Sequence, residues 1–277
     1  MAWNFGDILD TIIPVLPDNH LALVHGDREI TWAQMSSRSN NLGRFMLENG
    51  ANIGDKVGFY MRNRPEYMET LAACFRARLT HVNVNYRYVA DEVHYIFDNS
   101  DAAVVVYGKE FRDNVEILRP RLPNVKLWIE VGDGAGLPAD THDYEQLTAT
   151  GNGENLDLAR EGGDLLFLYT GGTTGMPKGV MWEHDALRET QTMALRALGD
   201  VPETLDELKA HLQANGPGEG YIPACPLMHG TGLFTAMAAM MNGGTIVTLG
   251  AASLDADELW RTVERRGVQN IAMVGDA

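Results

Sequence analysis

Cysteine is nearly absent from this sequence, since Cys74 and Cys225 are the only two in 277 residues. Two cysteines support neither a disulfide framework nor a zinc site built from several thiolates. Residues 1–10 hold no basic segment followed by an apolar one, so no signal peptide is expected. No apolar run approaches the roughly 18 residues of a membrane-spanning helix, and none is expected. These absences favour a reducing, cytoplasmic location.

Basic residues are also scarce. The chain has 22 Lys and Arg against 38 Asp and Glu, which gives a formal charge of 22 − 38 = −16. A protein this acidic has no general electrostatic attraction for duplex nucleic acid, so nucleic acid is not an expected partner. An anionic nucleotide can still bind at a local site made of backbone N–H groups and a few cations. With 45% hydrophobic and 22% charged residues, the composition is that of an ordinary globular protein.

Apolar, strand-like runs alternate with helix-like segments along most of the chain. The residues Thr31 to Gln34 have the pattern of a capping box, which predicts a helix from there to Gly50. This alternation predicts an α/β fold built from two βα-repeat subdomains with mostly parallel sheets. Strands are predicted at 56–61, 81–84, 102–107, 125–131, 165–169, 245–249 and 268–274. Helices are predicted from Pro65 through Phe75 and at 89–98, 185–198, 204–213 and 256–266.

The stretch 132–163 interrupts this rhythm. It is rich in Gly, Asp and Asn and has only short apolar runs, so it is interpreted as a surface connection. The first subdomain is therefore predicted to span 1–163. The second is predicted to start at 164 and to be incomplete at 277, because a parallel strand with nothing after it is an unusual end for a domain.

The most informative stretch runs from Tyr169 to Val180 and reads YTGGTTGMPKGV. Four glycines, three threonines and one lysine follow directly after an apolar strand. Glycine lets backbone N–H groups approach a ligand closely, threonine adds hydroxyl donors, and Lys178 adds a mobile cation. Together these groups suit a polyphosphate. A flexible surface loop is the alternative, and the coincidence of hydroxyls, cation and preceding strand disfavours it.

Two common nucleotide-binding motifs are excluded here. A Walker A loop requires Gly-Lys followed by Ser or Thr, whereas Lys178 follows Pro177 and precedes Gly179. The stretch also lacks the G-x-G-x-x-G spacing of a dinucleotide-binding fold.

The stretch does resemble the phosphate-binding loop of the adenylate-forming enzymes, which include acyl-CoA synthetases, luciferases and peptide-synthetase adenylation domains. The family pattern Thr-Ser-Gly-Thr-Thr-Gly-x-Pro-Lys-Gly is matched at every position but one, where Gly171 replaces the usual Ser. The segment 226–233 is similar to the family's Pro-Leu-x-His-x-x-Gly segment beside the acyl site. The Gly-Gly variant, residues 180–182 and the final residues resemble fatty-acyl and steroid-side-chain CoA ligases. The resemblance covers nearly the whole chain but only the first half of a family member.

The resemblance implies a ligase that uses ATP, Mg²⁺ and CoA to activate a small-molecule carboxylic acid of the fatty or steroid-derived class. The carboxylate would attack the α-phosphorus of ATP, and the CoA thiol would then displace AMP from the acyl-adenylate. Lys178 and His229 are the implied catalytic residues, and Thr174 is the implied Mg²⁺ contact. The residues implied to bind the nucleotide are Thr170, Gly171, Gly172, Thr173, Thr174, Gly175 and Lys178. Whether the protein forms a homodimer is left open.

Other polar residues are given structural roles. His184 is expected to be structural, and residues 62–64 are interpreted as a solvated basic turn. Asn83 is expected to serve turn and subdomain packing. Gly230 and Thr231 are small where the family usually has bulkier residues, which favours a roomy acyl pocket.

Two other classes of function stay open. One is another adenylating enzyme, which would activate an amino acid or an aryl acid. The other is a non-catalytic fragment that binds nucleotide. The family's Tyr-Gly-x-Thr-Glu-type segment, its Thr-Gly-Asp segment and its small C-terminal domain with a catalytic Lys have no counterpart in the sequence. These 277 residues are therefore expected not to form acyl-CoA by themselves.

Overall fold

The computed structural model describes residues 3–172, 175–196, 199, 201–251 and 253–275. Their strands form two sheets, and the α/β fold with mostly parallel strands agrees with the prediction. The five-stranded sheet has the order β12-β10-β11-β1-β2, with β1 at Leu21–His25, β2 at Arg28–Thr31, β10 at Tyr221–Pro223, β11 at Ile246–Thr248 and β12 at Asn270–Ala272.

The seven-stranded sheet has the order β7-β6-β5-β3-β4-β8-β9. Its strands are β3 at Lys56–Tyr60, β4 at Thr80–Asn83, β5 at Ala102–Gly108, β6 at Leu127–Val131, β7 at Thr141–Asp143, β8 at Leu165–Gly172 and β9 at Gly175–Glu183. Neighbours in both sheets run parallel except for two hairpins, β1–β2 and β8–β9. Both sheets take strands from each side of residue 163, and the division into 1–163 and 164–277 stays a prediction.

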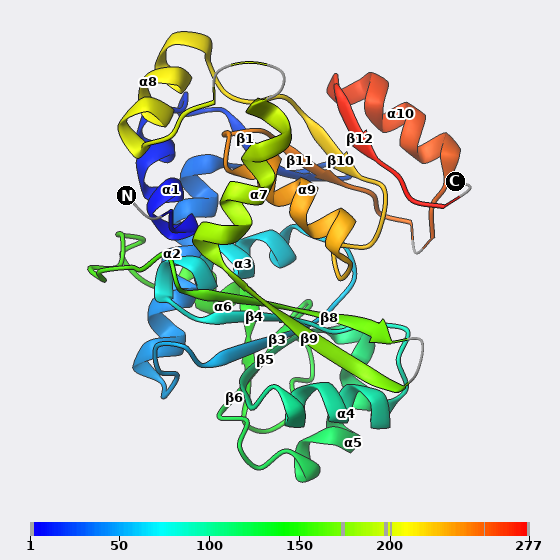
Figure 1. Cartoon of the computed structure of the whole chain (residues 1–277). Coiled ribbons are helices and arrows are strands. Elements are labelled where there is room, and N and C mark those ends of the chain that lie inside the picture. The colour runs from blue at the N-terminus through cyan, green and yellow to red at the C-terminus, as the bar shows by residue number, and fades with distance from the viewer. Residues whose placement is uncertain (1–2, 173–174, 197–198, 200, 252, 276–277) are drawn as a thin grey trace.

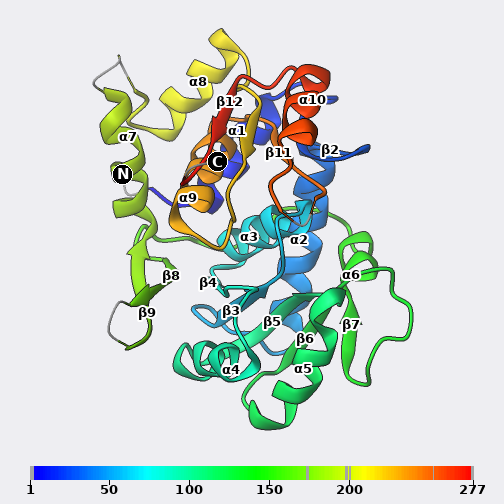
Figure 2. The same cartoon turned by 90° about the vertical axis from the view of Figure 1, so that its right-hand side faces the viewer.

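Helices fill the space between the sheets and cover their outer faces (Figure 1). The largest core lies between the sheets and holds buried side chains of α1 (Phe5–Ile12), α2 (Trp32–Glu48), α3 (Pro65–Ala77) and α9 (Gly230–Met240). On the outer face of the seven-stranded sheet, α4 (Ala90–Asn99) and α5 (Arg112–Leu118) bury a second core. On the five-stranded sheet, α10 (Ala256–Arg266) buries a third, on the side away from α9 (Figure 2).

Local sequence signals explain several element boundaries. The Thr31 side chain accepts a hydrogen bond from the backbone of Gln34, and the Gln34 side chain bonds back to Thr31, so the predicted capping box starts α2. Pro65 occupies the first turn of α3, where its missing N–H costs nothing. The helix α10 ends at Gly267, which has a left-handed conformation.

The connection 132–163 contains more structure than predicted. It carries β7, which pairs with β6, and α6 (Tyr144–Ala149), which packs on α2. Tyr144 and Leu156 are buried in the core between the sheets, so this segment is partly an interior one. The remaining helices, α7 (His184–Arg196) and α8 (Leu205–Asn215), follow the β8–β9 hairpin along the chain.

Candidate active site

The predicted phosphate-binding stretch forms the end of an antiparallel hairpin rather than an open loop. In this hairpin β8 extends to Gly172 and β9 begins at Gly175, with Thr170 paired to Lys178 and Gly172 to Gly175. Residues 170–172 and 175–179 of the loop-like stretch are therefore strand, because the two arms of the hairpin satisfy each other's backbone groups. Thr173 and Thr174, including the candidate Mg²⁺ contact, lie outside the described residues.

The end of the hairpin is open to solvent. Thr170, Gly171, Gly175 and Lys178 are all exposed. Among the described residues, no atom lies within 4 Å of the position that a side-chain Cβ would take at Gly175, and at Gly171 the nearest is the Tyr88 hydroxyl at 4.0 Å. A ligand can therefore reach the backbone at these two glycines.

Thr170, Lys178 and the start of α9 lie on one face of the hairpin. Leu168 and Thr170 are two residues apart on a strand, so their side chains point the same way, and Lys178 lies directly opposite Thr170. The Cβ position at Gly230, the first residue of α9, is 3.1 Å from the Leu168 Cδ2 atom. The start of α9 therefore sits over the face that presents Thr170 and Lys178.

His229 precedes α9 at its N-cap position and is exposed. Its backbone N–H donates to the Pro226 carbonyl at 3.1 Å, and its carbonyl accepts from the Leu233 N–H at 2.9 Å. Desolvation on the protein side of the ring and the positive charge of Arg87 lower the pKa of His229 below its usual value. The imidazole is therefore neutral at pH 7, and its unprotonated nitrogen can accept a hydrogen bond.

His184 is placed quite differently. It is 1% exposed, and its ring lies 4.9 Å from the rings of both Phe5 and Phe75. Burial lowers the pKa of His184 to about 4. This packing supports the structural role expected from the sequence.

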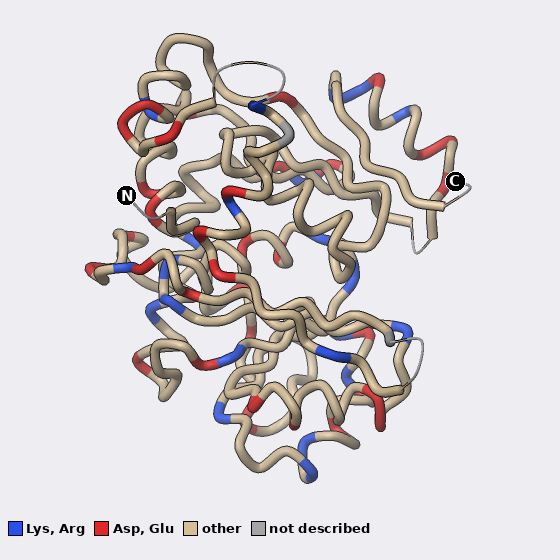
Figure 3. The backbone as a smooth tube through the Cα atoms, in the orientation of Figure 1, with Lys and Arg blue, Asp and Glu red and all other residues tan. Residues whose placement is uncertain are grey.

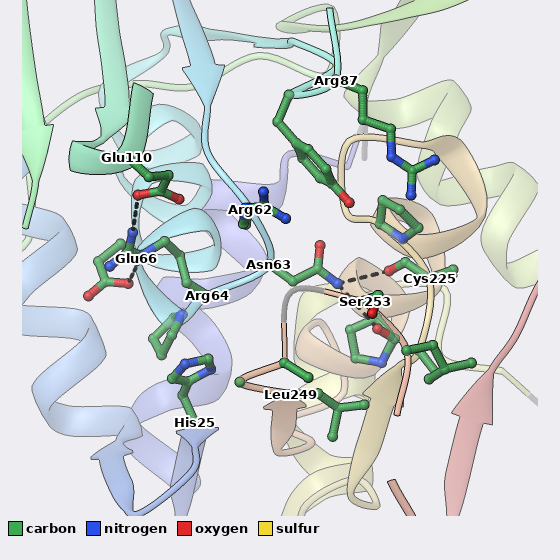
Figure 4. Close-up of a pocket in the computed structure, with 18 of the residues that line it drawn as sticks. His25, Arg62, Asn63, Arg64, Glu66, Arg87, Glu110, Cys225, Leu249 and Ser253 are labelled. Carbon is green, nitrogen blue, oxygen red and sulfur yellow. Dashed lines mark hydrogen bonds and ion pairs between the residues drawn. The ribbon is translucent and has the colours of Figure 1, made fainter. Parts of the chain in front are cut away.

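A basic cavity of about 380 Å³ lies where the carboxyl ends of strands from both sheets meet (Figure 4). Binding sites of α/β proteins commonly form at such strand ends. Four arginines line the cavity, namely Arg28, Arg62, Arg64 and Arg87. The solvated turn expected at 62–64 is thus half-buried in a cavity wall. The sequence signal was the two arginines after β3, but Arg28 and Arg87 join them only through the fold.

Two carboxylates only partly offset these cations. Glu66 is 2% exposed and bonds to Arg28 and, at 3.0 Å, to the Nε atom of Arg64. Burial alone would raise the pKa of the Glu66 carboxyl, but Arg64 and Arg28 outweigh it and hold the pKa below its usual value. Glu110 lies 3.5 Å from Arg64.

The other two arginines of the cavity, Arg62 and Arg87, lie beside the Tyr86 ring. The guanidinium carbons of Arg62 and Arg87 lie 4.9 and 5.7 Å from the centre of the Tyr86 ring.

Burial lowers the pKa of His25, which is therefore neutral. Among the lining residues, four guanidinium groups against two carboxylates give a net charge of 4 − 2 = +2, and Arg28 also bonds to the Glu145 carboxylate at 3.0 Å. Acidic and basic residues are otherwise scattered over the backbone (Figure 3), so this cavity is a local concentration of positive charge in an acidic protein.

Among the described residues, no group of three or more His, Cys, Asp or Glu side chains could hold a metal ion. None of the helices in this part of the chain is both long and apolar enough to span a bilayer.

Comparison with known proteins places this arrangement in a family. The family model described as AMP-binding enzyme matches residues 14–276. The chain is 34% identical over 280 residues to a 3-oxocholest-4-en-26-oate–CoA ligase of Rhodococcus rhodochrous. It is 35% identical over 285 residues to a medium/long-chain-fatty-acid–CoA/3-oxocholest-4-en-26-oate–CoA ligase of Mycobacterium marinum. Both alignments cover 100% of this chain, which spans about half the length of these curated relatives (50% and 51%).

Solved structures show the same fold. The N-terminal domain of FACL13 from Mycobacterium tuberculosis, in an inhibitor-bound crystal, has a TM-score of 0.78 at 22% identity, over 98% of this chain and 62% of its own. The anthranilate CoA ligase AuaEII, crystallised with anthranoyl-AMP, has a TM-score of 0.82 at 21% identity, over 98% of this chain and 49% of its own. The family match over nearly the whole chain shows that the chain belongs to the AMP-binding enzyme family.

Proposed function

We propose that this chain is the ATP-phosphate- and acid-binding part of an ATP-dependent acid–CoA ligase. The reaction would join a carboxylate to the α-phosphorus of ATP with release of pyrophosphate, and the CoA thiol would then displace AMP. The observation that carries the proposal is the hairpin end, where Thr170 and Lys178 lie opposite each other on the face below the start of α9.

The groups at the hairpin suit charge stabilisation on phosphate. Lys178 would neutralise charge on the leaving pyrophosphate, and the Thr170 hydroxyl with the backbone at Gly171 and Gly175 would orient the phosphate oxygens. A neutral His229 at the start of α9 would accept or donate a hydrogen bond at the acid's side of the site. Thr173 and Thr174 would add two more hydroxyls.

Mg²⁺ is proposed to arrive with the nucleotide as the MgATP complex. Threonine hydroxyls and phosphate oxygens are hard ligands of the kind that Mg²⁺ prefers. Thr174 is the residue of this chain proposed to contact the ion.

The basic cavity is proposed to hold the phosphates of the second nucleotide-like substrate, CoA. The hairpin and the cavity are two separate anion sites, and the reaction has two phosphate-bearing substrates. Arg62 and Arg87 face Tyr86 at one wall of the cavity.

The acid is proposed to be a medium-chain, long-chain or steroid-derived carboxylic acid, the classes named for the relatives. A buried, apolar helix face suits such an acid, and α9 contributes Met237 and Met240 to the core beside the site. Gly230 is tightly placed, because its Cβ position faces Leu168 at 3.1 Å and Phe234 at 3.7 Å. A larger residue there would press on β8 as well as narrow the space for an acid.

The proposal is tested by titrating the purified chain with MgATP and with stable acyl-adenylate mimics in a calorimeter. Mimics carrying a long-chain fatty acid, an amino acid and an aryl acid separate the proposed ligase class from the two other activating classes. We expect binding of MgATP and preference for the fatty-acyl mimic, but no thioester when CoA and acids are added to the chain alone. Absence of MgATP binding would contradict the proposal, and preference for an aminoacyl or aryl mimic would reassign the acid.

A further inference from the structure

Two asparagines lie at or just after the ends of neighbouring strands of the seven-stranded sheet, and both contact the same segment of chain. Asn83 is the last residue of β4, and Asn63 lies three residues after the end of β3. Both side chains bond to the backbone of the segment 223–228, which leads from β10 of the other sheet to His229. The two amides therefore tie the two sheets together at the edge where the candidate site lies.

Asn83 uses its whole amide. Its Oδ1 accepts from the Tyr169 N–H at 2.6 Å, and its Nδ2 donates to the Tyr169 carbonyl at 3.0 Å and to the Met228 carbonyl at 2.6 Å. The residue is 2% exposed. Buried amides with every bond satisfied hold their partners in one arrangement, since loss of any bond leaves a polar group unpaired away from water.

The two residues held by Asn83 are the immediate chain neighbours of two proposed site residues. Tyr169 precedes Thr170, where the phosphate-binding end of the hairpin begins, and Met228 precedes His229. We propose that Asn83 is a positioning residue that fixes the hairpin and the start of α9 relative to each other, so that ligand contact at one is transmitted to the other. This inference rests on the proposed function for its ligand, but the physical link that it names does not.

The chemistry requires an amide rather than a carboxylate at position 83. An Asp side chain has nearly the same shape but no N–H to donate, and it would place negative oxygen against two carbonyl oxygens. The variant Asn83→Asp therefore removes the link to Met228 and one link to Tyr169 with little change in volume.

Asn63 offers a matched control. Its Nδ2 donates to the Cys225 carbonyl at 2.9 Å and to the Pro223 carbonyl at 3.3 Å, and its Oδ1 accepts from the Leu227 N–H at 2.7 Å. It thus holds the same segment by three bonds, but none of them reaches the hairpin. Asn63→Asp should loosen this segment alone.

The experiment is hydrogen–deuterium exchange by mass spectrometry on the 277-residue chain, for the parent, Asn83→Asp and Asn63→Asp, with and without MgATP. Without nucleotide, we expect Asn83→Asp to speed amide exchange about tenfold in both 165–172 and 226–234, and Asn63→Asp to speed it in 223–234 only. Exchange in β5, which neither asparagine touches, should not change. With MgATP, the parent and Asn63→Asp should gain protection in the hairpin and in 226–234, and Asn83→Asp should lose the gain in 226–234.

The outcomes test the link made by Asn83 and the proposed function independently of each other. Faster exchange in only one of the two segments for Asn83→Asp would overturn the inference. The inference would also be overturned if amide exchange rose equally in β5, both in Asn83→Asp and in the milder Asn83→Ser, because such a rise is general destabilisation. If MgATP protects nothing in the parent, the proposed function fails, and exchange without nucleotide still decides the role of Asn83.

Discussion

Lys178 is the only cationic side chain among the described residues of β8 and β9, and it is exposed at the end of the hairpin. Its position opposite Thr170 comes from strand pairing, which the sequence did not predict. The residue itself was identified from the motif. Its phosphate-binding role stays a prediction, made from a Lys that stands among glycines and threonines.

Replacing Lys178 with Ala should weaken MgATP binding by about ten- to a hundredfold, because a charge-assisted contact contributes roughly 1.5–3 kcal/mol. The fold should persist, since the side chain is exposed. Calorimetric titration of the variant measures this loss. Lys209→Ala removes the same charge from the exposed surface of α8 and should bind like the parent. Equal dissociation constants for both variants would show that Lys178 does not contact the phosphates.

At the scale of elements, the close approach of β3 to α4 depends on one glycine. A Cβ added at Gly58 would lie 2.3 Å from the Cε1 atom of Phe97, whose ring is buried in the core below the sheet. The strand β3 is central, with β4 and β5 on its two sides, so it cannot easily shift away.

Gly58→Ala should therefore lower the free energy of unfolding by about 1–3 kcal/mol, the usual cost of overpacking a core. Urea unfolding followed by circular dichroism measures the change. Gly163→Ala is the matched control, because no atom of the described part of the chain lies within 4 Å of its Cβ position, and it should leave stability within about 0.5 kcal/mol. A Gly58→Ala variant as stable as the control would show that α4 and the sheet can separate without cost.

Element boundaries were predictable where the signal is local. The capping box at the start of α2 was predicted, and α10 was predicted at 256–266 and found at Ala256–Arg266. The strand β9 was missed, since it is held by backbone pairing with β8 and its sequence, with Gly175, Pro177 and Gly179, suggests a loop. No strand is predicted before residue 56, yet β1 lies inside the five-stranded sheet.

At the scale of the whole molecule, two imidazoles are buried in the uncharged state. Burial lowers the pKa of His81 to about 3 and that of His184 to about 4. The Tyr67 hydroxyl lies 2.9 Å from the Nε2 atom of His81, which is wholly buried, whereas neither ring nitrogen of His184 has a hydrogen-bond partner among the described residues. Both histidines must remain neutral for the protein to stay folded.

Stability should therefore fall as the pH drops below about 6.5, the ordinary pKa of an unfolded histidine. The unfolded chain then binds protons that the folded chain does not bind. Each imidazole contributes up to about 1.4 kcal/mol per pH unit to the slope of the free energy of unfolding against pH. Urea unfolding at pH 7, 6 and 5 measures the slope. His184→Phe, which keeps the aromatic contacts with Phe5 and Phe75, should lose about half of it. An unchanged slope in this variant would mean that His184 does not titrate on unfolding.

The sequence by itself determined the α/β class and the family, because these depend on residue type, short spacing and periodicity within a few turns or strands. Only the tertiary structure decided what surrounds the motif. Leu23 of β1 pairs with Ile246 of β11, and Asn83 holds Tyr169 and Met228, contacts that join residues far apart in the chain. The same holds for the basic cavity, whose arginines come from different strand ends. Hydrogen bonds and ion pairs between such distant groups leave no local pattern, so the link that Asn83 makes between Tyr169 and Met228 could not be deduced before the chain was folded.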